Sequence, residues 1–169
     1  MPSHRAKIAL VPAFLMPVLL AASALPASAQ LLERKDLSYA IAKTIAEAAI
    51  ADCKSRGHNT SAVVVDRAGD TVIAMRYDDA GPHTMENARR KAYTARAFRR
   101  TTAAYAKRLE EGNPVVKQQI TLPHVIAIPG GVPIKVGDDV IGGVGVSGSP
   151  GVDESCVQAG LDKVADHLK

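Results

Sequence analysis

The sequence predicts an α+β fold: a five-stranded antiparallel sheet with flanking helices, in the chain order α-β-β-α-α-β-β-β-α. Three observations support this prediction. The chain has 169 residues, a length that suits one compact domain. Stretches with apolar residues at three- and four-residue spacing alternate with short β-branched runs. Tight turns join several of these runs, and a tight turn connects antiparallel strands.

Residues 1–29 have the three parts of a secretory signal peptide. A basic start is followed by an apolar stretch over residues 8–20 and by a small-x-small cleavage site at residues 27–29. We therefore expect residues 30–169 to form a single exported domain, periplasmic or secreted. An uncleaved membrane anchor is disfavoured, because two prolines break the apolar stretch and it is shorter than the ~20 residues that a span needs.

Composition narrows the function classes. The net charge is +4, and Arg5 and Lys7 of the expected leader carry two of these charges, so the domain is not basic enough to favour nucleic acid. The two cysteines exclude a disulfide-dense miniprotein and a multi-cysteine zinc module. No later apolar segment is long enough to cross a bilayer, so we expect no stable membrane insertion after cleavage.

The first half of the domain predicts a helix and a hairpin. Asp36 or Ser38 can cap a helix whose apolar residues repeat with helical spacing and which ends at Gly57. The β-branched run over residues 61–66 and the alternating run over residues 71–77 predict two strands. A short turn rich in Asp and Gly joins them into a hairpin.

The second half predicts two helices, three strands and a closing helix. Thr84 can cap a helix that loses its pattern at residues 99–102, and a further helical piece ends at Asn113 and Pro114. The remaining expected elements are strands over residues 125–128, 132–136 and 140–146, and a helix over residues 152–168.

The last expected strand is unusually rich in glycine. Residues 142–148 read Gly-Gly-Val-Gly-Val-Ser-Gly, and the alternation of side chains leaves one face of the strand nearly bare. The pattern is not a dinucleotide-binding loop, because no parallel β-α unit surrounds it. Close packing of a helix and the wall of a ligand pocket both explain it.

Five sequence blocks follow one another along the domain: Val63–Asp70, Asp79–Pro82, Ala88–Ala95, Pro129–Ile134 and Gly142–Gly148. In this order and spacing they resemble the GlcG/HbpS-like family of haem-binding, haem-degrading proteins, over about residues 37–168. The resemblance implies a profilin-like or PAS-like domain and homo-oligomerisation. It also implies, as in some secreted members, binding of haem and iron with slow haem degradation.

We therefore expect an exported, oligomeric haem-binding protein, with slow haem degradation as a further implied activity. The alternative is an exported module that binds a small metabolite, such as an organic acid, without haem. Another class of enzyme is less favoured, because the chain has no nucleophile elbow, Ser/His/Asp signature or P-loop. The aromatic content of 4% argues against a deep porphyrin-stacking pocket.

Two histidines are candidate site residues. The absence of HExxH, CxxC and CxxCH motifs leaves non-covalent haem with one axial histidine. The residue that meets the iron in the secreted relative aligns with Val125, which cannot ligate. Its neighbour His124 can, although neighbouring strand residues point to opposite faces, and an ordinary hydrogen bond is the alternative. His83 either faces a small-molecule pocket or bonds a free backbone group at the start of a helix.

Three arginines are candidates for binding haem propionates or another carboxylate. Arg89, Arg96 and Arg100 follow at spacings of seven and four and so are expected to share a helix face. A solvated face or a subunit interface is the alternative. In an iron-reducing relative, a Glu-x-x-Glu pair stands where this chain has Glu86-Asn-Ala-Arg89. An arginine repels a cation, so we expect that iron site to be absent.

The two cysteines are candidates for a disulfide. Cys53 lies near the end of the first expected helix and Cys156 in the opening turn of the last one. If these helices pack antiparallel on one face of the sheet, the two side chains meet, and an oxidising compartment would join them. Two buried thiols that never touch are the alternative.

Overall fold

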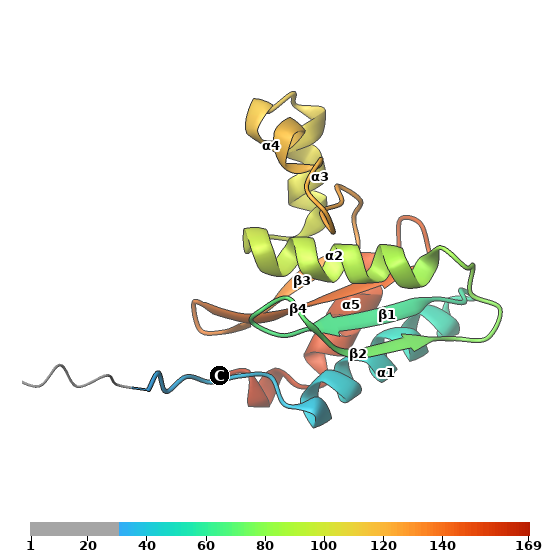
Figure 1. The fold of residues 1–169 in the computed structure, drawn as a ribbon. Helices are drawn as coiled ribbons and strands as arrows, with labels where there is room; N and C mark the ends of the chain where they lie inside the picture. Colours follow the sequence, from blue (N-terminus) through green and yellow to red (C-terminus); the bar gives the residue numbers. More distant parts are fainter. Residues whose placement is uncertain (1–30) are drawn as a thin grey trace, which may run out of the picture. The chain divides into compact units, whose positions relative to one another are not determined.

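A four-stranded antiparallel sheet forms the centre of the fold, in the strand order β2-β1-β4-β3 (Figure 1). The strands are β1 (Ser61–Val65), β2 (Thr71–Arg76), β3 (Gly131–Val136) and β4 (Asp139–Ser147). The structure is a computed structural model that describes residues 31–169, and its compact unit runs from Arg34 to Lys169. The expected signal peptide lies outside the described residues.

The antiparallel α+β architecture is confirmed, but the prediction of five strands is wrong. Residues 125–128 are irregular. His124 before them has a left-handed backbone (φ 69°), and Pro129 follows. The segment pairs with a helix instead of a strand: the Ile126 N–H donates to the Thr94 hydroxyl at 2.9 Å, and the Arg90 guanidinium donates to the Val125 carbonyl.

Two helices, α1 (Tyr39–Ser55) and α5 (Asp153–Asp162), cover one face of the sheet and enclose the main hydrophobic core with it (Figure 1). Ser38 caps α1 by accepting a hydrogen bond from the Ile41 N–H. A disulfide joins Cys53 to Cys156 between the two helices, with the Cα atoms 5.4 Å apart. Helix α5 ends before the predicted residue 168, and a short 3-10 turn, Ala165–His167, follows it.

Helix α2 (Thr84–Phe98) covers the opposite face. It lies against the bare side of β4, where a Cβ on Gly143 or Gly145 would overlap the backbone of α2. Close helix packing therefore explains these two glycines. Helix α2 ends where Arg99 adopts a left-handed conformation (φ 53°). The expectation that Arg100 continues the same helix face is wrong for this reason.

Helices α3 (Thr102–Glu110) and α4 (Pro114–Gln119) form an arm that projects away from the sheet (Figure 1). The predicted helix end at Asn113 is also the start of α4, because the Asn113 side chain caps the new helix. Tyr105, Val116 and Val125 form a small separate core under the arm. None of the described helices is long and apolar enough to span a membrane.

We expect the disulfide between Cys53 and Cys156 to contribute strongly to stability. Cys53 and Cys156 are 103 residues apart, so the bond removes much of the freedom of the unfolded chain. In the chain-entropy account, replacing both cysteines by Ala lowers the free energy of unfolding by up to ~4–5 kcal/mol. Urea unfolding of the parent and the double variant measures this difference. Equal midpoints, or two free thiols per denatured parent chain without reductant, would contradict it.

Candidate functional site

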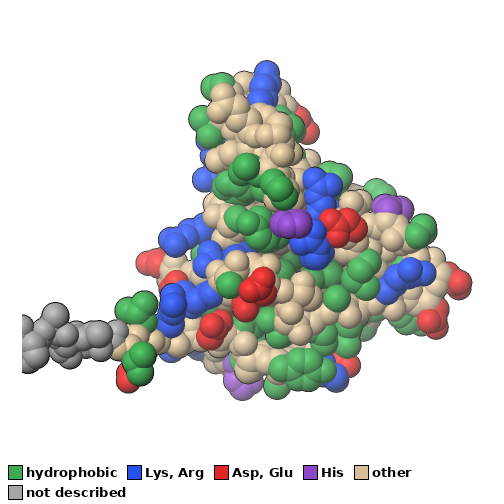
Figure 2. Space-filling view, viewed as in Figure 1, with side chains coloured by type: hydrophobic (Ala, Val, Ile, Leu, Met, Phe, Trp, Pro, Cys, Tyr) green, Lys and Arg blue, Asp and Glu red, His purple; other side chains and the backbone are tan. Residues whose placement is uncertain are grey.

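Two neighbouring surfaces flank α2 and contain the histidines that the sequence singled out. On the face shown in Figure 2, Lys and Arg side chains gather over α2 with acidic and histidine side chains among them. One surface, here called the His124 surface, consists of Glu86, Arg89, Arg90, Tyr93 and His124. The other is a cavity at the start of α2 and α5, here called the His83 pocket.

The His83 pocket has a volume of about 480 Å³ and opens where β4 ends. Its polar lining includes Asn59, His83, Asn87 and Ser147, and the ion pair of Lys91 with Asp153 forms its base. Ile128, Pro129 and Pro150 supply apolar walls. A volume of this size lies within the usual range of small-molecule sites, about 300–1,000 Å³.

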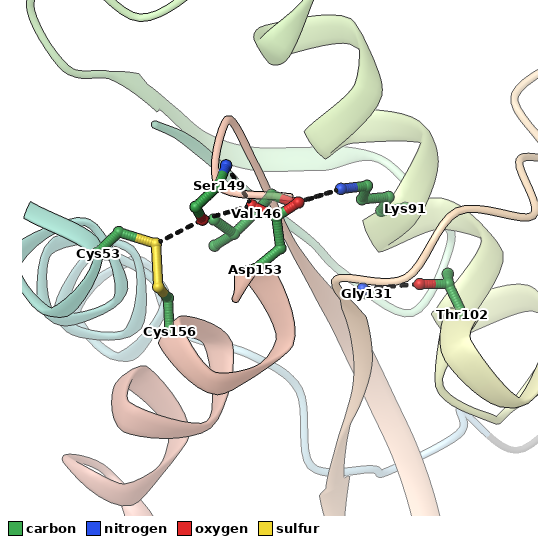
Figure 3. A network of polar contacts seen from close by, with 8 residues as sticks. All are labelled: Cys53, Lys91, Thr102, Gly131, Val146, Ser149, Asp153 and Cys156. Carbon is green, nitrogen blue, oxygen red and sulfur yellow. Dashed lines mark hydrogen bonds and ion pairs between the residues drawn. A yellow bond between two sulfur atoms is a disulfide. The ribbon is translucent and has the colours of Figure 1, made fainter. Parts of the chain in front are cut away.

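The base of the pocket is a buried ion pair. The Lys91 ammonium lies 2.7 Å from the Asp153 carboxylate, and their side chains are 1% and 8% exposed. Lys91 also donates to the Val146 carbonyl at 2.9 Å (Figure 3). Burial lowers the pKa of Lys91, while the hydrogen bond and charge of Asp153 oppose this shift. The pair is costly to bury and is held in place by these bonds.

Asp153 and the disulfide are connected through one serine (Figure 3). The second carboxylate oxygen of Asp153 accepts hydrogen bonds from the Ser149 N–H at 2.9 Å and the Ser149 hydroxyl at 2.7 Å. The Ser149 hydroxyl also lies 3.1 Å from the Cys53 sulfur. The loop that leads from β4 into α5 is therefore held by Asp153 and by the disulfide. This loop forms part of the pocket wall, so the wall is fixed by the same contacts.

His83 lies on the rim of this pocket. It occupies the N-cap position of α2 but makes no side-chain capping bond, and its ring lies beside Gly81. Of the two alternatives for His83, the structure therefore shows a residue that faces a pocket. A ligand for it stays a prediction.

The His124 surface places an exposed imidazole beside an arginine. His124 projects from a left-handed backbone, and its Nδ1 lies 2.7 Å from the Arg89 guanidinium. Arg89 also forms two hydrogen bonds with the Glu86 carboxylate, at 2.9 and 2.8 Å, and these hold the pKa of Glu86 below its usual range. The Tyr93 ring meets the imidazole edge-on, with centroids 5.7 Å apart. Val125, by contrast, is buried under the arm.

The Arg89 contact determines which nitrogen of neutral His124 holds the proton. A guanidinium only donates hydrogen bonds, so Nδ1 accepts and the ring proton is on Nε2. Coordination of a metal by Nε2 needs the opposite tautomer, with a lone pair on Nε2 and the proton on Nδ1. Arg89 must therefore release His124 before Nε2 can act as a ligand.

Two of the predicted arginines lie elsewhere. Arg96 is two turns from Arg89, about 10 Å along α2, in a separate pocket of about 260 Å³ with Arg34, Asp66 and Arg67. Burial, with the nearby charges of Arg99 and Arg67, lowers the pKa of Arg96. Arg100 lies beyond the end of the helix and donates to the Phe98 carbonyl. The structure thus brings only Arg89 of the three to His124.

Sequence reasoning missed Lys91, Arg90 and the polar lining of the pocket. A signal for Lys91 was present: it lies three residues after Ala88 and four before Ala95, on the buried stripe of α2. A lysine on such a stripe needs a buried acidic partner. No local pattern pointed to Asn59, Asn87 or Ser147, because distant elements bring them together. Within residues 31–169, no group of three His, Cys, Asp or Glu side chains could hold a metal ion.

We expect the loss of the Lys91–Asp153 ion pair to destabilise the protein strongly. Lys91→Met leaves the Asp153 carboxylate buried without its counter-charge, which typically costs about 3–5 kcal/mol. Lys107→Met is the matched control, since the Lys107–Glu111 pair is exposed and 3.8 Å apart and should contribute under ~1 kcal/mol. Denaturant unfolding of both variants measures the difference. A Lys91→Met variant as stable as the control would show that the pair does not hold the fold together.

The partly buried carboxyl of Glu154 should make the stability of the protein depend on pH. Burial raises its pKa above the usual value of 4.5, and its buried Oε2 has no hydrogen-bond partner among residues 31–169. The folded state therefore disfavours the ionised carboxyl, so this group lowers stability as the pH rises through and above that value. Glu154→Gln should raise the melting temperature at pH 7 and leave it nearly unchanged at pH 4. A difference that does not vary with pH would contradict this.

Known proteins resemble this chain over most of its length. The family model described as "Haem degrading protein HbpS-like" matches residues 37–162. Protein GlcG of Escherichia coli K12 is 32% identical over 111 residues, 66% of this chain and 81% of GlcG. Crystal structures of HbpS (TM-score 0.74, 32% identity, 80% and 94% of the two chains) and of PduOC in complex with haem (TM-score 0.71, 25% identity, 76% and 94%) have the same fold. The chain therefore belongs to the HbpS-like haem-degrading protein family.

Proposed function

We propose that this protein is an exported, oligomeric haem-binding protein in which His124 is the axial ligand. The observation that carries the proposal is the position of His124: an exposed imidazole 2.7 Å from Arg89, in a segment whose next residue, Val125, is bonded through its carbonyl to Arg90 of the same helix. The family to which the chain belongs and the similar PduOC–haem complex support it.

The residues of the His124 surface fit the chemistry of haem. Haem presents a flat apolar ring, an iron with axial positions and two carboxylates. His124 offers the nitrogen ligand, and Arg89 and Arg90 offer guanidinium groups that bind carboxylates. Arg90 is the less available of the two, because its Nη2 donates to the Val125 carbonyl and its Nε is buried, without a partner among the described residues. Tyr93 and the exposed Leu122 supply apolar surface.

Ligation by His124 requires one rearrangement of the protein's own side chains. Arg89 releases His124, the imidazole proton moves to Nδ1, and Nε2 turns its lone pair outward. The freed Nη2 donor of Arg89 then becomes available to a propionate, while Glu86 keeps hold of the same guanidinium. Bound haem would supply an iron that carries ligands and electrons. An open surface without a catalytic cluster suits a binding protein more than a turnover enzyme, so haem degradation would be slow.

Export and assembly belong to the same proposal. The signal-peptide pattern of residues 1–29 points to a periplasmic or secreted protein, and the disulfide between Cys53 and Cys156 suits an oxidising compartment. Homo-oligomerisation follows from the family resemblance. The exposed apolar side chain of Val115 on α4 gives the arm a surface that a second subunit can cover.

The alternative is a module that binds a small metabolite without haem. The observation that favours it is the His83 pocket, whose volume of about 480 Å³ lies apart from His124 on the other flank of α2. The two functions are separated by hemin titration of the purified protein. A Soret band that is shifted and sharpened relative to free hemin supports haem binding, whereas a spectrum identical to that of free hemin would contradict it.

The variant His124→Ala tests the ligand. We expect it to lower the hemin affinity by at least about tenfold and to change the Soret band, because the axial nitrogen is lost. His167→Ala, an exposed histidine in the final 3-10 turn, is the control and should bind hemin like the parent. If His124→Ala binds normally, His83→Ala and Arg96→Ala come next. Unchanged hemin binding in all three variants would show that the site is misplaced.

A further inference from the structure

The His83 pocket contains hydrogen-bonding side chains that the fold does not use. Ser147, on β4, is 4% exposed and lines the pocket, and its hydroxyl has no hydrogen-bond partner among residues 31–169. The side-chain amide of Asn87 likewise has none within that range. Asn59 accepts a hydrogen bond from Lys54 through its oxygen, which leaves its NH₂ group free. The Ser147 hydroxyl is open to the pocket rather than sealed in the interior, so a ligand or water can pair with it there.

The charges in the pocket cancel. Lys91 and Asp153 neutralise each other at 2.7 Å, and the remaining Asp153 oxygen is taken by Ser149. His83 is the only other titratable group in the lining. No permanent charge is therefore left to balance a charged ligand. A carboxylate would lose its hydration in a pocket whose single lysine is already paired.

The free groups indicate what the ligand must offer. A serine hydroxyl and an asparagine amide can each donate and accept, and hydroxyl groups of a ligand do the same. A purely apolar ligand would leave Ser147 unpaired. The walls formed by Ile128, Pro129 and Pro150 suit the carbon atoms of a short chain or ring.

We infer that the His83 pocket binds a small uncharged polyol, with hydroxyl groups that pair with Ser147, Asn87 and Asn59. This site is separate from the His124 surface: Asn87 and Lys91 face the pocket, whereas Arg89 faces His124. The inference does not depend on haem binding.

Matched pairs of ligands test the inference. Glycerol and erythritol are titrated against glycerate and erythronate, which differ by one carboxylate, while amide NMR signals of the isotope-labelled protein are followed. We expect saturable shifts at Ser147, Gly148 and Asn87 with the polyols, and at least about tenfold weaker binding of the carboxylates.

Ser147→Ala removes the unpaired hydroxyl and adds no bulk. It should weaken polyol binding about tenfold, whereas Ser155→Ala, at an exposed serine of α5, should leave it unchanged. Ser147→Ala should also leave the hemin Soret band unchanged, so failure of this inference and failure of the haem proposal can be told apart. Stronger binding of the carboxylates, shifts that never saturate, or equal polyol binding in Ser147→Ala would each overturn the inference.

Discussion

The buried ion pair of Lys91 and Asp153 connects the two sides of the molecule. Lys91 belongs to the helix on one face of the sheet, and Asp153 begins the helix on the other face. Two buried charges are costly, and this pair is sustained by further bonds to Val146 and Ser149. The pair also forms the base of the His83 pocket. The same interaction therefore connects the layers and occupies both charges in the pocket lining.

The ion pair requires α2 to lie very close to the sheet, and the glycines of β4 make this possible. A side chain at Gly143 or Gly145 would collide with the backbone of α2. Farther along the strand, the same face carries Ser147, which lines the pocket. Close helix packing thus explains Gly143 and Gly145, while Ser147 and Gly148 at the end of the pattern line a cavity. Both candidate surfaces depend on the position of α2.

Local patterns predicted the elements well where their hydrogen bonds are local. The helix after Ser38 and the hairpin of β1 and β2 follow from spacing and capping alone. The segment after His124 was misread because its β-branched composition resembles a strand, whereas its backbone bonds go to Thr94 and Arg90 of α2. The meeting of Arg89 with His124 likewise depends on tertiary structure. Only the order of Cys53 and Cys156 on two helices allowed a long-range contact to be anticipated.

The strength of the Arg89 contact decides whether His124 can serve as a ligand. The Glu86–Arg89 pair is largely exposed, and such pairs usually contribute under ~1 kcal/mol. The hydrogen bond from Arg89 to exposed His124 has a charged donor, for which the usual net contribution is about 1.5–3 kcal/mol, and competition with water favours the lower end of that range. The contact therefore orients the imidazole in the free protein, and in the proposed haem complex coordination of the iron would have to offset its loss.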